Sequence, residues 1–237
     1  MAAEDRKSTV LAGDDTPENL DVGKGILGDD YQVKVAINGH IALKIAQSQA
    51  PDLILLDIMM PEIDGYEVCR QLKANSVTKD IPVIFLTAKG ETSDEAEGFA
   101  LGAADYILKP VNPPLLQARV KTQLALKHNM DELQAAYAVI NRQKERMQQE
   151  LNVGRDIQLS MVPDTFPAFP DRDEFDIHGL LKPAREIGGD FYDYFFVERN
   201  KLCICVGDVS GKGVPAALFM AVAKTMIKST SADDHPP

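Results

Sequence analysis

Short runs of apolar residues alternate with helix-like segments from the N-terminus to about residue 122. Five runs have the length of β-strands: TVLA, VKVAI, LILLD, PVIFLT and DYIL. Each is followed by a stretch with helical spacing, which is typical of a parallel sheet with helices on both faces. LILLD and VIFL are apolar at consecutive positions, as expected of central strands. The pattern predicts an α/β domain with a flavodoxin-like, five-stranded parallel sheet, whose ligand site lies at the carboxyl ends of its strands.

Polar residues stand at the ends of four predicted strands. Asp14 and Asp15 follow the first strand, Asp57 ends the third, Thr87 ends the fourth and Lys109 follows the fifth. Because parallel strands end at one edge of their sheet, we expect these side chains to converge. Three neighbouring carboxylates repel one another and favour a divalent cation such as Mg²⁺. Asp57 can then attack phosphorus, while the metal and Lys109 stabilise the transferring charge.

Each of these residues also has a simpler interpretation. Two aspartates before TPENL can begin a helix, because aspartate favours the cap and the first turn. A Lys-Pro pair is usually a turn, and Tyr106 can be a packed aromatic. The joint occurrence of the whole set at strand ends favours the phosphoacceptor site.

Four separated motifs carry a family resemblance: the acidic pair, LILLDIMMPEIDG, LTA and ADYILKP. In this order and spacing, residues 8 to about 122 resemble the receiver domain of bacterial two-component response regulators. The resemblance implies that Asp57 accepts phosphate from a histidine kinase, and that Thr87 and Lys109 bind the phosphoryl oxygens. It also implies that the Met59 carbonyl joins Asp14, Asp15 and Asp57 around Mg²⁺, and that Tyr106 reports the position of Thr87 as a switch.

Two places depart from the receiver pattern. Ala12 and Gly13 precede the acidic pair, where bulky apolar residues are usual, and Gly23 lies in the first helix, where an aliphatic residue is expected. Glycine costs on the order of 1 kcal/mol in helix propensity and leaves packing volume unfilled. We therefore expect looser packing around the first strand and helix.

Residues 123–161 contain no strand pattern and predict a long helix. Seven of eight positions in an alternating four-three series are apolar, which indicates a coiled-coil seam. The series is Leu126, Met130, Leu133, Tyr137, Ile140, Lys144, Met147 and Leu151. We expect a parallel homodimer through residues 126–151, with docking onto a neighbouring domain as the alternative. The seam ends near Gly154, which is a candidate hinge.

From residue 161 the composition changes to a segment rich in proline and acidic residues, MVPDTFPAFPDRDEF, which marks the entry to another domain. FDIHGLL, DFYDYFFV and KLCICVGD predict antiparallel strands, with ERNK as a turn, and VPAALFMAVAKTMIKS predicts a mostly buried helix. GDVSGKG is one residue too short for a phosphate-binding P-loop. Cys203 and Cys205 alternate inside an apolar strand, as buried structural thiols do.

Asp208 ends one of these strands and Asp190 begins another, so two carboxylates can meet at one sheet edge. Such a pair suits Mg²⁺ or Mn²⁺, and a two-metal site can generate hydroxide for attack on a phosphoester. Strand-flanking aspartates beside glycines are, however, usually turns.

LNVGRDIQLSMVP, PAREIGGDFYDYF and GDVSGKGVPAALFMA, in this order, resemble the serine/threonine phosphatase domain of the sporulation protein E and sigma-factor regulator type, a branch of the metal-dependent 2C-type phosphatases. The resemblance implies Asp190, Asp208 and the Val209 carbonyl as metal ligands, with Asp193 a weaker candidate. It implies phosphoserine or phosphothreonine protein substrates, such as an anti-sigma factor antagonist. That family uses further aspartates, for which Asp233 and Asp234 are poor substitutes, so we expect an incomplete, truncated α+β domain.

The formal net charge of −11 opposes binding to nucleic acid or to anionic membranes. The sequence lacks an apolar run long enough to cross a bilayer, and MAAEDRKSTV lacks the apolar segment of a secretory signal. We therefore expect a cytoplasmic protein.

The sequence predicts three parts: a receiver domain over residues 1–122, a helical coiled-coil linker over 123–162 and the N-terminal portion of a 2C-type phosphatase domain over 163–237. The predicted function is phosphate acceptance on Asp57, which controls a phosphatase output that is inactive in this chain. The alternative is a non-enzymatic module for phosphorylation-dependent dimerisation or interaction.

Overall fold

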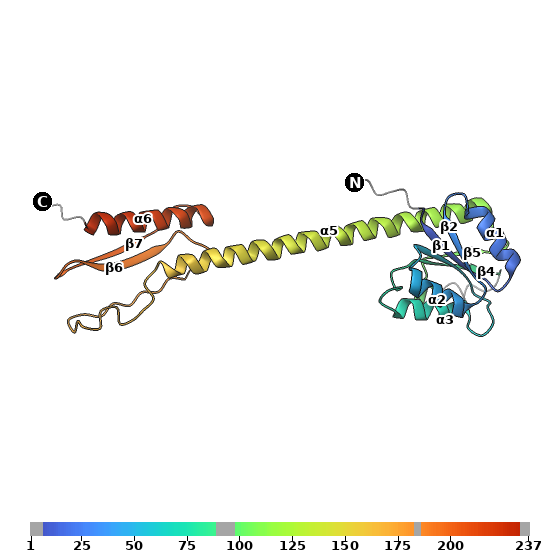
Figure 1. The fold of residues 1–237 in the computed structure, drawn as a ribbon, viewed down its shortest axis with the longest axis horizontal. Coiled ribbons are helices and arrows are strands. Elements are labelled where there is room, and N and C mark those ends of the chain that lie inside the picture. The colour runs from blue at the N-terminus through green and yellow to red at the C-terminus, as the bar shows by residue number, and fades with distance from the viewer. Residues whose placement is uncertain (1–6, 89–97, 183–185, 233–237) are drawn as a thin grey trace. The chain divides into compact units, whose positions relative to one another are not determined.

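The computed structural model describes residues 7–88, 98–182 and 186–232 (Figure 1). The chain divides into two compact units, Met1–Ala136 and Tyr137–Pro237. The first three residues of the predicted PAREIGGD motif, together with Asp233 and Asp234, lie outside the described residues.

The first unit contains a five-stranded parallel sheet in the order β2-β1-β3-β4-β5. Its strands are β1 (Thr9–Gly13), β2 (Gln32–Ala36), β3 (Leu53–Asp57), β4 (Val83–Thr87) and β5 (Asp105–Leu108). Every residue of β1 and β3 is buried, which explains their unbroken apolar sequence. The predicted flavodoxin-like sheet is therefore confirmed.

Helices cover both faces of this sheet (Figure 1). They are α1 (Pro17–Leu27), α2 (Gly39–Gln49), α3 (Gly65–Ala74) and the first turns of α5 (Pro113–Ser160). The α2 and α3 side packs around Phe85, and the α1 and α5 side packs around Ile84 and Leu55. Local caps fix the helix starts, because the side chains of Asn38 and Asp64 accept hydrogen bonds from backbone N–H groups in the first turns of α2 and α3.

Helix α5 is continuous over 48 residues, and Asn112 caps its start by accepting a hydrogen bond from the Leu115 N–H at 3.2 Å. Leu116 and Val120 are buried against the sheet. Residue 122, where the sequence predicts the end of the first domain, therefore lies inside one continuous helix whose first turns pack against the sheet.

The second unit contains an antiparallel hairpin and helix α6 (Val214–Ala232). Strand β6 (Phe191–Glu198) pairs with β7 (Lys201–Gly207), and Phe191 lies opposite Gly207. The predicted turn at ERNK joins them. The glycine-rich stretch before α6 is a turn in which Gly211 and Gly213 have φ values of 121° and 73°, a region that side-chain-bearing residues rarely adopt.

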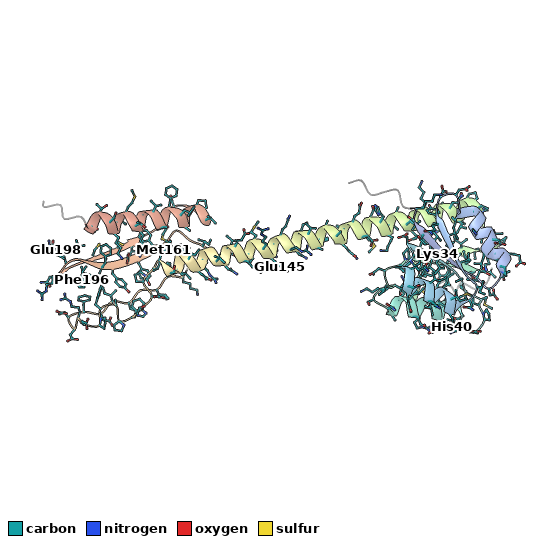
Figure 2. The ribbon with its side chains drawn as sticks, viewed as in Figure 1. Lys34, His40, Glu145, Met161, Phe196 and Glu198 are labelled. Carbon is teal, nitrogen blue, oxygen red and sulfur yellow. The ribbon has the colours of Figure 1, made fainter. Side chains whose placement is uncertain are left out.

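Two expectations about this unit are wrong. Residues 175–181 (FDIHGLL) form no strand. Instead the Phe175 ring packs edge-on against the Phe169 ring, with centroids 5.9 Å apart. The Phe169 ring centroid in turn lies 4.8 Å from that of Phe196, which is labelled in Figure 2. Phe175 and Leu180 remain exposed, so the segment makes aromatic contacts without a ladder partner and without a buried face. Helix α6 is not mostly buried: Ala216 and Met220 are buried, while Leu218, Phe219, Val222 and Met226 are exposed.

Across the part of the chain that the structure describes, every helix is too short or too polar to span a lipid bilayer.

Candidate functional site

The carboxyl edge of the parallel sheet brings together an acidic cluster and a lysine. One carboxylate oxygen from each of Asp14, Asp15 and Asp57 lies within 4.8 Å of the other two. Asp14 and Asp57 are 2% and 6% exposed, whereas Asp15 is exposed. Lys109 Nζ lies 2.8 Å from Asp14 Oδ2 and 3.0 Å from Asp57 Oδ2. One ammonium therefore faces two buried carboxylates, with the third at the surface.

Burial and charge act in opposition at this edge. Burial raises the pKa of Asp57, and so does the charge of Asp14, although Lys109 works to lower it. Burial works to lower the pKa of Lys109, but its hydrogen bonds and charge interactions with Asp14 and Asp57 outweigh burial, so this pKa is raised. The cluster holds more negative charge than Lys109 neutralises, and a divalent cation would complete the balance.

Asn19 fixes the orientation of Asp14. The Asn19 side-chain amide donates to Asp14 Oδ1 at 3.0 Å and to Oδ2 at 3.1 Å. The backbone N–H of Thr16 also donates to Oδ1, at 2.9 Å. The start of α1 therefore holds the carboxylate in place, and the sequence reasoning missed Asn19 because no spacing rule distinguishes it from an ordinary residue of a first helical turn.

The predicted residues Thr87, Tyr106 and Met59 lie in three different settings. Thr87 ends β4, and its hydroxyl donates to the Ala88 carbonyl at 3.0 Å. Tyr106 packs between Phe85 and Phe99, with ring centroids 5.6 and 4.8 Å away, and its hydroxyl end lies over Gly98. Met59 is 74% exposed, and its backbone N–H donates to Asp57.

The donor set fits magnesium. Carboxylate oxygens from three aspartates are the hard ligands that Mg²⁺ prefers, and Mg²⁺ usually keeps several waters. Asp15 is exposed and so leaves a side of the cluster open to water and to an incoming phosphate.

The second unit brings Asp190 and Asp208 together at one end of the hairpin. They flank the Phe191 and Gly207 pair of the ladder, and a hydrogen bond between the two carboxyl groups raises the pKa of Asp190. They line a hollow of about 260 Å³ with Gly188, Gly211 and Lys212. Two adjacent carboxylates repel each other and are suited to a hard divalent cation, which would relieve that repulsion.

Glycine lets the backbone at Val209 approach this pair. A Cβ atom at Gly189 would lie 2.6 Å from the Val209 carbonyl oxygen. The loop before Asp190 and the turn after Asp208 are therefore packed against each other, which places the Val209 carbonyl near the segment that carries Asp190.

Asp193, the weaker candidate ligand, is engaged elsewhere. It is 3% exposed, and its Oδ2 lies 2.6 Å from Lys224 Nζ of α6, whose side chain is 12% exposed. This buried ion pair joins β6 to α6. Spacing gave no indication of it, because Lys224 lies in an apolar helix far along the chain.

The end of α5 holds the loop that precedes Asp190. Gln158 is 4% exposed; its amide donates to the Gly188 carbonyl at 2.5 Å and accepts from the Gly188 N–H at 3.1 Å. One turn earlier, a Cβ atom at Gly154 would lie 2.9 Å from Ile187 Cδ1. The glycine predicted as a hinge is thus a close-approach position, and α5 runs through it as helix.

Residues 10–121 match the family model of the response regulator receiver domain, and residues 198–237 match that of stage II sporulation protein E. Residues 10–121 are a response regulator receiver domain. A solved receiver domain protein from Methanospirillum hungatei JF-1 is 26% identical, covers 52% of this chain and 98% of its own, and superposes with a TM-score of 0.50.

Two curated relatives match about half of this chain. A Vibrio cholerae serotype O1 protein named "Probable cyclic di-GMP phosphodiesterase" is 48% identical over 132 residues, which cover 55% of this chain and 30% of that protein. Response regulator PleD of Caulobacter vibrioides is 39% identical over 125 residues, which cover 52% of this chain and 28% of PleD. The chain thus spans less than a third of either relative.

Proposed function

We propose that this chain is a phosphorylation-controlled regulator whose receiver domain accepts a phosphoryl group on Asp57 from a histidine kinase. The observation that carries this proposal is the convergence of Asp14, Asp15 and Asp57 within 4.8 Å, with Lys109 Nζ 3.0 Å from Asp57. An oxygen of Asp57 forms a bond to phosphorus while the bond from phosphorus to the donor's histidine nitrogen breaks, and the nitrogen takes the electron pair.

We assign to the surrounding residues the roles that the resemblance to receiver domains implies. Asp14, Asp15, Asp57 and the Met59 carbonyl would hold Mg²⁺, which supplies charge stabilisation for the phosphoryl oxygens. Lys109 moves from its two carboxylates to the incoming phosphoryl group, and the Thr87 hydroxyl donates to the same group. Tyr106 is the residue whose packing between Phe85 and Phe99 reports the position of Thr87.

The C-terminal segment supports a metal-dependent protein phosphatase as the controlled output. In this proposal Asp190, Asp208 and the Val209 carbonyl hold Mg²⁺ or Mn²⁺, and the substrate is a phosphoserine or phosphothreonine protein such as an anti-sigma factor antagonist. The match of residues 198–237 to the sporulation protein E family supports this reading, as does the contact between the two carboxyl groups.

We also propose the organisation and location that the sequence predicted. Residues 1–122 are the input, 123–162 the linker and 163–237 the output part, in a cytoplasmic homodimer. Six of the seven apolar side chains of the seam, all except Leu151, are between 52% and 63% exposed. A second copy of the helix would cover them. Figure 2 shows side chains projecting along α5.

A second candidate function is a non-enzymatic interaction module. One observation favours it: in the described residues, the Asp14, Asp15 and Asp57 group is the only cluster of three or more metal-binding side chains. Asp190 and Asp208 form a pair, whereas a two-metal hydrolytic centre needs more ligands than two carboxylates supply.

Phosphate acceptance is tested with acetyl phosphate and Mg²⁺, read by intact mass. The wild-type chain and Asp30→Asn, an exposed control, should gain one phosphoryl group, and Asp57→Asn should gain none. Labelling that persists in Asp57→Asn contradicts the proposal.

The output is tested separately with a chromogenic phosphate ester and Mn²⁺. This chain should accept phosphate without turnover of the ester. Hydrolysis that disappears in Asp208→Asn would instead assign an active phosphatase and exclude the interaction module.

A further inference from the structure

A cavity lies beneath the phosphoacceptor edge of the receiver domain, between α1, the sheet and the start of α5. Its volume is about 250 Å³. Its walls are mostly aliphatic and include Ala12, Leu20, Leu55, Leu86 and Leu116, while Asp14, Asn19 and Lys109 form its polar end. Protein interiors are otherwise close-packed, with few voids larger than a water molecule.

Small residues create this space. Ala12 and Gly23 line the cavity from β1 and from α1. Gly23 is half-buried, yet a Cβ atom there would meet nothing within 4 Å. The helix therefore faces the cavity without a side chain at the position where an aliphatic residue would fill it.

We propose that this cavity is a binding site for a compact, neutral, largely apolar molecule of the size of a one-ring or two-ring aromatic. An apolar cavity of about 150 Å³ already holds benzene, and a space lined by aliphatic side chains gives water few hydrogen-bond partners. The volume of about 250 Å³ is at the small end for ligand pockets, which excludes nucleotides and other large ligands.

The charge at the polar end selects against anions. Asp14 forms part of the cavity wall, Asp57 lies beyond it, and Lys109 is already shared between them. Both Asn19 amide contacts go to Asp14. A carboxylate-bearing ligand would meet an edge with surplus negative charge, whereas a neutral N–H or O–H group can donate to it.

Occupation of the cavity is linked to the phosphoacceptor edge. The ligand would pack against Asn19, which orients Asp14, and beside Lys109. Binding of the ligand would therefore change the affinity for Mg²⁺, and Mg²⁺ would change the affinity for the ligand by the same factor. The site therefore offers a small-molecule input to the receiver domain, in addition to phosphorylation.

The test uses the full chain with labelled methyl groups, titrated with indole and followed by NMR. Saturable shifts are expected at the methyl groups of Ala12, Leu20 and Leu116. Indole-3-carboxylate should bind about tenfold more weakly or not at all because of the negative edge. The absence of saturable shifts, or equal binding of both probes, overturns the proposal.

Two variants of α1 provide a matched comparison. Gly23→Leu fills the cavity and should weaken indole binding by about tenfold or more. Gly25→Leu adds the same side chain at an exposed glycine that is outside the cavity lining and should retain wild-type binding. Ala12→Val fills the cavity from the sheet side and replaces Gly23→Leu if that variant does not fold. Indole binding that survives in a folded filling variant overturns the assignment to this cavity.

Discussion

Gln158 and Gly188 form a closed pair of hydrogen bonds, in which the Gln158 amide donates to the Gly188 carbonyl at 2.5 Å and accepts from the Gly188 N–H at 3.1 Å. Gly188 lies two residues before Asp190. The last turns of α5 thereby fix the loop that carries one member of the Asp190 and Asp208 pair.

Replacing Gln158 with alanine should destabilise the second unit. Both backbone groups of Gly188 lose their partner in a half-buried loop, which costs about 1–3 kcal/mol for each polar group left unsatisfied. Urea denaturation would show the loss as a lower midpoint. Gln148→Ala is the matched control on the same helix, because Gln148 is exposed and its side-chain amide donates to the Asn152 side chain within that helix. Equal stability of the two variants would show that the Gln158 pair contributes nothing.

The Asp193 and Lys224 ion pair should show strong coupling. Lys224→Met leaves a buried carboxylate without its cation, and breaking a buried pair in this way costs about 3–5 kcal/mol. The double variant Asp193→Leu with Lys224→Met removes both charges and should recover most of that loss. A double-mutant cycle measured by chemical denaturation checks this expectation, and simple additivity of the two substitutions would contradict it.

Magnesium should stabilise the receiver domain against unfolding. A ligand that binds only the folded state adds about 2.7 kcal/mol when its concentration is a hundred times its Kd. A thermal scan should therefore show a higher midpoint with Mg²⁺ than with EDTA. Asp14→Asn should abolish the shift and the exposed control Asp30→Asn should keep it. An unchanged shift in Asp14→Asn would place the ion elsewhere.

The parallel sheet was predictable from sequence because its central strands are covered on both faces. LILLD is apolar at every position before Asp57, and β3 is buried at every position. The convergence of Asp14, Asp57 and Lys109 followed from parallel topology alone, since Asp57 ends a strand and the other two directly follow one. The looser packing around the first strand and helix was also predictable, because Gly23 has no side chain to fill the space where an aliphatic residue is expected.

Contacts between distant polar residues were not predictable in this way. Gln158 and Gly188 are 30 positions apart, and a glutamine in a polar helix has no distinctive pattern. The strand predicted over residues 175–181 failed for a related reason: its backbone finds no strand partner, and its apolar side chains stay exposed or half-buried, even where the Phe175 ring contacts Phe169 and Phe196. A local apolar pattern therefore does not indicate whether a segment finds a strand partner or what covers it.

Lys73 should make the free energy of unfolding increase as the pH rises through the alkaline range. Its ammonium donates to the carbonyls of Lys79 and Ile81 at 2.9 and 2.8 Å, and burial lowers its pKa. Between the lowered folded pKa and the higher unfolded one, the unfolded chain binds more protons, so stability rises with pH through this group. Relative to Lys73→Met, which cannot titrate, the wild-type free energy of unfolding should increase across that window. A difference that stays flat or falls would contradict the lowered pKa.

Lys144 is the polar member of the exposed seam on α5, and in a parallel homodimer two copies would face each other. Lys144→Leu should tighten self-association, because each buried leucine contributes about 1.5–3 kcal/mol relative to an exposed one. Sedimentation equilibrium would show a lower dimer dissociation constant. Glu145→Leu adds the same side chain one position away, outside the seam (Glu145 is labelled in Figure 2), and should leave the constant unchanged. If both variants lower the dissociation constant equally, non-specific hydrophobic association rather than the seam drives self-association. If neither variant self-associates, α5 is not a dimer interface.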